Sequence, residues 1–252
     1  LVLSILLQDI KREFVLSDSQ LGLLAGFAFT MFYVIAGFPM ARLADRANRK
    51  SIVAAALGFW SLMTAVSGLA VGFWSLFLAR IGVGMGEGAS GPSSQSVLAD
   101  YFRPGELPRA MGILTLGSTT GTGIGLMAGG LFASLYGWRM SFILLGIPGM
   151  LLAILLYTTV REPERGRYSA GGADSAAQRP LGATIRSLLS NRVYLGLITG
   201  YAVQIMIGYA IAIWMAPIML RSFALSTRDV GFYLGLAFVL GGIPGPILGG
   251  VL

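Results

Sequence analysis

The chain has 252 residues, of which 55% are hydrophobic and only 12% are charged, and its mean hydropathy is +0.76. A soluble domain carries about twice that charged fraction, so the composition excludes a soluble globular protein and indicates an integral membrane protein. The net charge of +7 would suggest nucleic acid in a soluble protein, but here the basic residues lie in short loops, and we expect no nucleic-acid partner. The absence of Cys and His excludes a disulfide framework, a Cys nucleophile and a Ser–His–Asp triad, and it removes the usual zinc and haem ligands. We therefore expect no cofactor, no metal site and no enzyme.

Apolar segments of spanning length recur along the chain and predict an all-α membrane protein. They cover residues 19–43, 51–71, 73–99, 109–135, 138–160, 192–219 and 227–252. Residues 1–10 are apolar but too short to span, since a spanning helix needs about 20 residues, and they lack the features of a signal peptide. We interpret them as the end of a helix whose start is missing, which gives about eight helices. Ser17 and Gln20 fit a capping box that starts the second helix.

The basic residues sort to one side of the predicted membrane. Twelve of the 18 Lys and Arg residues fall in the loops after the second, fourth and sixth helices, five fall in the opposite loops, and Arg80 lies inside a helix. Because cytoplasmic loops carry an excess of Lys and Arg, the first set is predicted to be cytoplasmic. Compact loops and a bias toward Ala, Gly and Arg favour a bacterial inner (plasma) membrane.

The longest loop, residues 161–191, is rich in Arg, Gly, Ala and Ser and is typical of a flexible linker. Within it, apolar residues recur at helical spacing at Leu181, Ile185, Leu188 and Leu189, which favours a short helix on the inner membrane surface. A solvated linker accounts for the same residues equally well.

An internal repeat predicts the domain organisation. Residues 17–43 align with 226–252 without a gap, and six of the 27 positions match. Parallel repeats of six helices are typical of one large class of transporters. We therefore expect 1–160 to be an N-terminal six-helix bundle, 161–191 a cytoplasmic linker, and 192–252 the first two helices of a second bundle that lacks about four helices.

The stretch RLADRANRK, residues 42–50, places five charged side chains between two apolar runs. Asp45 stands at the C-terminal end of the second helix, where the helix dipole disfavours a carboxylate, so we expect a compensating Arg or helix N-terminus nearby. Asn48 is expected to take a positive φ, because a sharp turn needs one and Asn tolerates it.

This stretch resembles the signature G-x-L-x-D-R-x-G-R-[RK] between helices 2 and 3 of the major facilitator superfamily. The matching residues are Leu43, Asp45, Arg46, Arg49 and Lys50, while Ala41 and Asn48 replace two glycines. Five segments also resemble the spinster branch: NRK at 48–50, FWSL at 59–62, VGMGEG at 83–88, ADYF at 99–102 and VREPERG at 160–166. The resemblance spans nearly the whole chain, although residues 200–252 carry little of it. It implies the major facilitator fold of two six-helix bundles, and we expect a monomer.

In that superfamily the charged loop is a conformational latch, which holds the cytoplasmic ends of the two bundles together in the outward-open state. By this resemblance the latch residues are Asp45 and Arg46, supported by Arg42, Arg49 and Lys50. The positive-inside rule alone would also account for the basic residues.

Two charges and a serine lie on one face of the fourth predicted helix. A charge at mid-membrane costs about 3 kcal/mol on insertion scales, so such residues are functional candidates. Arg80 and Glu87 are seven residues apart, about 10 Å along one face, and Ser94 follows seven residues later. Gly84 and Gly91 share that stripe, which predicts a small, polar cavity wall. The alternative is a structural pair, in which a partner on another helix neutralises each charge.

The same segment resembles the superfamily's helix-4 motif, an Arg followed by a glycine-rich stretch and associated with proton coupling. The resemblance implies that Glu87 carries a proton and that Arg80 binds an anionic head group or modulates Glu87. Gln204 and Tyr209 of a later helix are further candidates for the cavity wall, whereas an interfacial position is expected for Trp214.

Two other segments predict local features of helices. GTGIGLMAGG, residues 121–130, carries small residues that allow close helix packing. It resembles the superfamily's antiporter signature, but Leu126 replaces the proline and weakens that inference. Pro244, Gly245 and Pro246 are expected to kink the last helix.

The spinster resemblance implies a secondary active transporter that exports a lysophospholipid or sphingoid phosphate with proton coupling, in contact with membrane lipids. Two alternatives stay open. One is a transporter of drugs or small polar solutes on the same fold, and the other is a passive facilitator or scramblase.

Overall fold

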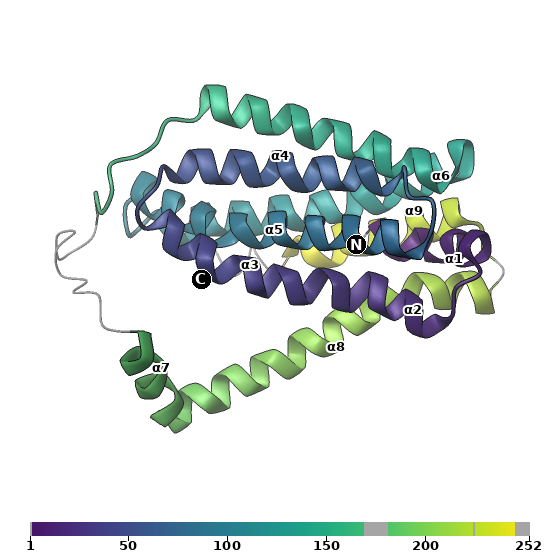
Figure 1. The fold of residues 1–252 in the computed structure, drawn as a ribbon. Helices are drawn as coiled ribbons and strands as arrows, with labels where there is room; N and C mark the ends of the chain where they lie inside the picture. The colour runs from purple at the N-terminus through teal and green to yellow at the C-terminus, as the bar shows by residue number, and fades with distance from the viewer. Residues whose placement is uncertain (1, 169–180, 224, 245–252) are drawn as a thin grey trace.

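The computed structural model describes residues 2–168, 181–223 and 225–244, and these residues form an all-helical protein (Figure 1). In chain order the elements are α1 (Val2–Phe14), α2 (Asp18–Gly22), the π-helical turn η1 (Leu23–Phe27), α3 (Ala28–Ala44), α4 (Arg49–Ser67), α5 (Phe73–Tyr101), α6 (Leu107–Thr159), α7 (Leu181–Ser190), α8 (Arg192–Ser222) and α9 (Thr227–Gly242).

These elements match the sequence-based expectation of about eight helices. α2, η1 and α3 form one continuous span, and the 53 residues of α6 are two helices that meet at Gly137. Gly137 has φ 84° and ψ 165°, a backbone conformation that is essentially restricted to glycine, so the chain reverses there. Four of the described segments are long and apolar enough to cross a membrane: Asp18–Ala44, Arg49–Ser67, Leu107–Thr159 and Arg192–Ser222.

Side-chain caps set where several helices begin. The capping box at α2 is confirmed, because Ser17 Oγ accepts from the N–H of Gln20 at 3.2 Å and Gln20 Oε1 accepts from the N–H of Ser17 at 2.8 Å. Ser226, which the internal repeat pairs with Ser17, is the N-cap of α9. The expectation for Asn48 was wrong. Its φ is −64°, and its side chain accepts from the N–H of Ser51 at 2.8 Å, because it caps α4 rather than forming a left-handed turn.

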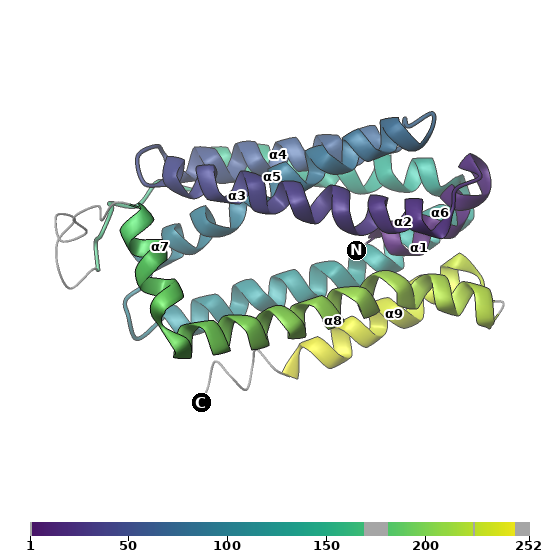
Figure 2. The same ribbon diagram turned by 60° about the horizontal axis from the view of Figure 1, so that its bottom comes forward.

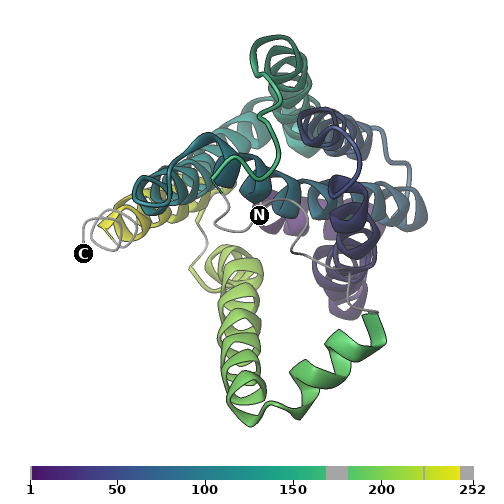
Figure 3. The same ribbon diagram turned by 90° about the vertical axis from the view of Figure 1, so that its left-hand side faces the viewer.

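The molecule has two ends, which we name by their charge. The basic end carries the turn between α3 and α4 together with α7, and the opposite end carries the reversal within α6 (Figure 1). α8 approaches α1 and α2 at the opposite end and diverges from α3 toward the basic end (Figures 1 and 2). Viewed from the basic end, α8 stands apart from α3–α5, and α7 runs from the end of α8 toward α3 (Figure 3).

The hydrophobic core lies toward the opposite end. Its fully buried side chains come from seven different elements: Ile5, Leu6, Leu7 and Ile10 of α1, Leu21 of α2, Leu24 of η1, Leu76 of α5, Phe142 of α6, Ala216 of α8 and Val230 of α9. α1 therefore forms the centre of this core, although it is among the shortest of the membrane helices that the structure describes.

Glycines bring two pairs of helices into close backbone contact. On α5, a Cβ at Gly84 or Gly88 would clash with the backbone of α3, at Phe29 and Tyr33 respectively. Between α6 and α9, a Cβ at Gly235 would come within 2.5 Å of the carbonyl oxygen of Gly123. The structure therefore shows close helix packing as the role of the small residues in the 121–130 segment.

Two local expectations fall near the limits of the described residues. Of the two alternatives left open for 161–191, a short helix is present as α7, and the stretch interpreted as a flexible linker falls largely in 169–180, outside the described residues. α9 ends at Gly242, just before the expected kink, and Gly245 and Pro246 also lie outside.

Candidate functional site

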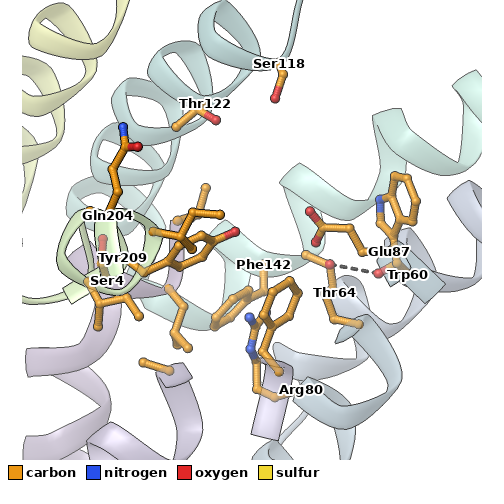
Figure 4. Close-up of a pocket in the computed structure, with 18 of the residues that line it drawn as sticks. Ser4, Trp60, Thr64, Arg80, Glu87, Ser118, Thr122, Phe142, Gln204 and Tyr209 are labelled. Carbon is orange, nitrogen blue, oxygen red and sulfur yellow. Dashed lines mark hydrogen bonds between the residues drawn. The ribbon is translucent and has the colours of Figure 1, made fainter. Parts of the chain in front are cut away.

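A cavity of about 660 Å³ lies midway along the helices (Figure 4). Its wall is formed by α1, η1, α3, α4, α5, both halves of α6, and α8. Of the four residues proposed for substrate or proton binding, the structure brings Arg80, Glu87 and Gln204 together in this wall. Ser94 is half-buried further along α5 and is not among the lining residues.

Arg80 is a buried cation that forms no ion pair with any carboxylate in the described residues. Its exposed fraction is 9%, and its guanidinium lies over the ring of Phe29, 5.3 Å from the centroid. Its Nε is buried without a hydrogen-bond partner in the described part of the chain, and no described carboxylate is within 4.0 Å of its nitrogens. Because a buried charge needs compensation, this guanidinium is suited to bind an anion that enters the cavity.

Glu87 lies two turns further along α5, nearer the basic end. Its side chain is exposed and points into the cavity, toward Tyr209 of α8 (Figure 4). α5 and α8 thus bring a carboxylate and a phenol to facing walls of one cavity.

Further polar side chains line the cavity beside these charges. They are Ser4, Thr64, Ser118, Thr122 and Tyr209 (Figure 4). Sequence reasoning considered Tyr209 but missed the others, because Ser and Thr are common in membrane helices. The only available signal was the four-residue spacing of Ser118 and Thr122, which places both on one face of α6.

One residue has a position that differs from the expected one, and a second is placed in the core. Gly84 was expected on the cavity wall, but it faces the backbone of α3 and allows close packing there. Trp214 packs against the hydrophobic core, 3.9 Å from the Cβ position of Gly22 on α2, and its expected place at the membrane interface stays a prediction.

At the basic end, Arg49 is buried inside the α1–α6 helices. It is 3% exposed, and it pairs with Asp100 of α5 at 2.5 Å and with Glu162 at 2.8 Å. Burial would raise the pKa of Glu162, but hydrogen bonds from Arg49 and from the N–H of Lys50 outweigh it and hold this pKa below its ordinary value. Arg49 therefore joins two helix ends to the start of the linker, and its support of a latch between bundles stays a prediction.

Arg165 supplies the compensation expected near Asp45. Its guanidinium donates to the backbone carbonyl oxygens of Ala44, Asp45 and Ala47 at the C-terminal end of α3. Cations are favourable at that end of a helix, because its last carbonyl groups lack partners.

The remaining proposed latch residues lie on the surface of the basic end. Asp45 and Arg46 are exposed. Arg42 lies 5.3 Å from the ring centroid of Phe38, and the Lys50 ammonium lies 4.8 Å from that of Tyr157. Asp45 and Arg46 are thus available to a partner surface at this end.

Taken together, spanning helices around a central cavity with embedded charges define an integral membrane protein of the transporter class. In the described part of the chain, no group of His, Cys, Asp and Glu side chains could hold a metal ion. The chain belongs to the Major Facilitator Superfamily, whose family model matches residues 1–252. The fold and family are those of transporters.

Three proteins illustrate this relationship. The chain is 30% identical over 99% of its length to an MFS-type efflux pump of Mycolicibacterium smegmatis, and 30% identical over 95% to a probable L-galactonate transporter of Escherichia coli. It matches the crystal structure of a bacterial homologue of the human lysosomal transporter Spinster, inward-facing and unoccupied, with 31% identity over 99% of the chain and a TM-score of 0.79. The chain spans 57%, 54% and 56% of these three proteins, respectively.

Proposed function

We propose that the protein is a secondary active transporter that exports an amphipathic anion, such as a lysophospholipid or a sphingoid phosphate, with proton coupling. The observation that carries this proposal is Arg80, a buried guanidinium with an unpartnered donor in a central cavity. A phosphate group would satisfy that donor and neutralise the charge. The similarity to the bacterial spinster homologue supports the substrate class that the resemblance implies.

The surroundings of Arg80 support the amphipathic character of the substrate. Apolar side chains line the same cavity: Leu3, Ala25, Phe29, Val83, Phe142 and Ile213. They would contact the apolar portion of a ligand whose head group is bound by the guanidinium.

Glu87 is the proposed proton carrier. Two negative charges in one low-dielectric cavity repel each other, so a bound anion favours the protonated form of Glu87. Anion binding and proton binding are then linked, and such linkage is the requirement for coupled transport.

We also propose that the protein works as a monomer in the bacterial plasma membrane. The bundle at 1–160 would rock against the bundle that begins at 192, and the latch at Asp45 and Arg46 would close the basic end. The divergence of α8 from α3 toward that end supports this motion (Figure 2).

A second candidate substrate is a small polar anion such as a sugar acid. Its support is the set of hydroxyl and amide groups in the same cavity, at Ser118, Thr122, Gln204 and Tyr209, which could bind several hydroxyl groups of a ligand. The similarity to the probable L-galactonate transporter favours it as well.

The test is uptake into liposomes that contain the purified intact protein, with and without an imposed pH gradient. One arm uses labelled lysophospholipid and the other labelled L-galactonate. Accumulation of the lysophospholipid above equilibrium only with the gradient would support the main proposal. Accumulation of galactonate alone would replace it with the second candidate.

The variant Glu87→Gln separates coupling from transport. We expect it to fold and to move substrate without response to the gradient. Normal gradient-driven accumulation in this variant would contradict the role of Glu87, and movement that never depends on the gradient, even in the unsubstituted protein, would indicate a facilitator or scramblase.

A further inference from the structure

Phe29 of α3 is the aromatic residue that the structure places against Arg80. The guanidinium carbon lies 5.3 Å from the centroid of the Phe29 ring, and both residues line the central cavity. The negative charge density on the face of an aromatic ring attracts a cation at such a distance. The ring thus supplies a compensation for Arg80 that no ion pair supplies within the described residues.

A close backbone contact fixes the height of Phe29 along α5. Gly84 follows Arg80 by about one turn of α5, and a Cβ at Gly84 would clash with the carbonyl oxygen of Phe29. Because no side chain separates the two helices there, the backbone of Phe29 lies one turn from Arg80. From this position the ring reaches the guanidinium.

The π-helical turn η1 sets the direction of the ring. At the end of η1 the N–H of Ala28 donates to the carbonyl oxygen of Leu23, five residues earlier, so this turn holds one residue more than an α-helical turn. One additional residue rotates the side chains that follow by about 100°. Relative to α2, whose Leu21 is fully buried in the core, α3 is therefore turned so that Phe29 faces Arg80.

We propose that Phe29 is a positioning residue for Arg80, and that η1 is present to direct its ring. A carboxylate partner would neutralise the guanidinium and occupy its N–H donors, whereas an aromatic ring holds the cation and leaves donors for an anion from the cavity. The buried Nε of Arg80, which has no hydrogen-bond partner in the described residues, fits this arrangement. The inference rests on the proposed function for the ligand only, since the contact itself needs none.

Phe27 offers a matched control. It is the last residue of η1, two positions before Phe29, but it is 52% exposed and is not among the residues that line the cavity. Phe27→Leu therefore makes the same chemical change in the same span without touching Arg80. We expect it to change neither of the two measurements below.

The first measurement uses no ligand. Thermal unfolding of the intact protein in detergent is compared for Phe29→Leu, Arg80→Gln and the double variant. If the ring compensates the guanidinium, Phe29→Leu lowers the unfolding midpoint more in the protein that retains Arg80 than in Arg80→Gln. Equal losses in the two backgrounds would overturn the proposal, because the ring would then only fill apolar space.

The second measurement is titration calorimetry with hexyl phosphate and with the uncharged hexyl glucoside. We expect Phe29→Leu to weaken binding of hexyl phosphate by about two- to thirty-fold, the range of a cation–π contact, without a matching loss for the glucoside. Phe29→Tyr retains the aromatic face and should restore most of the affinity. An equal loss for both ligands would contradict the positioning role.

The two measurements separate this inference from the proposed function. If hexyl phosphate bound equally well to Arg80→Gln, the proposed function would fail, and the unfolding comparison would still decide the role of Phe29. Should Phe29→Leu fail to fold, 3,4,5-trifluorophenylalanine at position 29 replaces it. Fluorine withdraws negative charge from the ring face and changes its shape little, so the unfolding midpoint and the affinity for hexyl phosphate must both fall. Unchanged values would refute the proposal.

Discussion

Among the charged side chains of the described residues, Arg80 is the one with a buried donor, its Nε, that has no hydrogen-bond partner. Its guanidinium is 9% exposed, and the structure offers it an aromatic face and electrostatic attraction from Glu87 but no direct ion pair. An arginine keeps its charge under such conditions, so the cavity attracts anions even when it is empty.

Replacing Arg80 should therefore act on affinity. We expect Arg80→Gln to weaken binding of the anionic substrate by roughly 10- to 100-fold, the range of one hydrogen bond to a charged group. Titration calorimetry of substrate binding to the detergent-solubilised protein measures this change in affinity. The control is Arg103→Gln, in an exposed loop, and an equal loss of affinity in the two variants would contradict a direct role for Arg80.

At the scale of the element, the close packing of α5 against α3 positions Arg80 and Glu87 in the cavity. A side chain at Gly88 would meet the backbone carbonyl of Tyr33, which cannot rotate away as a flexible side chain could. We expect Gly88→Ala to destabilise the protein by about 1–3 kcal/mol through overpacking. Gly91→Ala is the control, because a Cβ there would lie 3.7 Å from the nearest atom, the Tyr33 hydroxyl oxygen. Thermal unfolding in detergent distinguishes them, and equal stabilities would show that α3 shifts without penalty.

At the basic end, the linker start holds the ends of α4 and α5 together through Glu162, Arg49 and Asp100. The folded pKa of Glu162 is below the ordinary value of 4.5, so its contribution to stability is present above that value and is lost as the pH falls through the lower, folded pKa. We expect the thermal stability to decrease when the pH is lowered below about 4. The variant Glu162→Gln should be less stable at pH 7 and should lose that part of the pH dependence.

Glu164→Gln provides the control for this prediction. Glu164 is exposed, and it forms no ion pair within the described residues. Its replacement should leave the pH profile unchanged. If both variants changed the profile alike, the effect would belong to net charge rather than to the contact with Arg49.

At the scale of the whole molecule, the proposed cycle requires contacts that form at one end when those at the other end break. In this structure Arg221 of α8 pairs with Asp18 of α2, whereas Asp45 and Arg46 are exposed at the end where α8 diverges. The two sets of residues would thus stabilise opposite states of one equilibrium.

Loss of the proposed latch should therefore slow turnover. We expect Asp45→Asn to lower the transport rate by roughly five-fold or more, with substrate affinity unchanged, because only one of the two states loses a contact. Parallel assays of initial transport rate and of substrate binding test this. A matching loss of affinity would show that Asp45 acts on the cavity rather than on the equilibrium.

Particular residues show how far sequence reasoning reached. Arg80 and Glu87 stood out because a charge is rare in an apolar run, and Ser17 stood out because a capping box is a local pattern. Thr64 and Ser118 could not be predicted as cavity residues from the sequence. Hydroxyl side chains are common in membrane helices, and only the fold shows which of them face the cavity. Asn48 was misread for the same reason: a cap and a left-handed turn use the same residue type.

The sequence by itself determined the class of the protein, its membrane spans, its charge asymmetry and its family resemblance. These follow from hydropathy, charge and short motifs, which are properties of consecutive residues. Only the tertiary structure decided that Gly84 packs on α3, that Arg49 of α4 pairs with Asp100 of α5, and that Arg221 of α8 pairs with Asp18 of α2. Each of these depends on which helices meet, and at what distance, across more than 40 residues of chain.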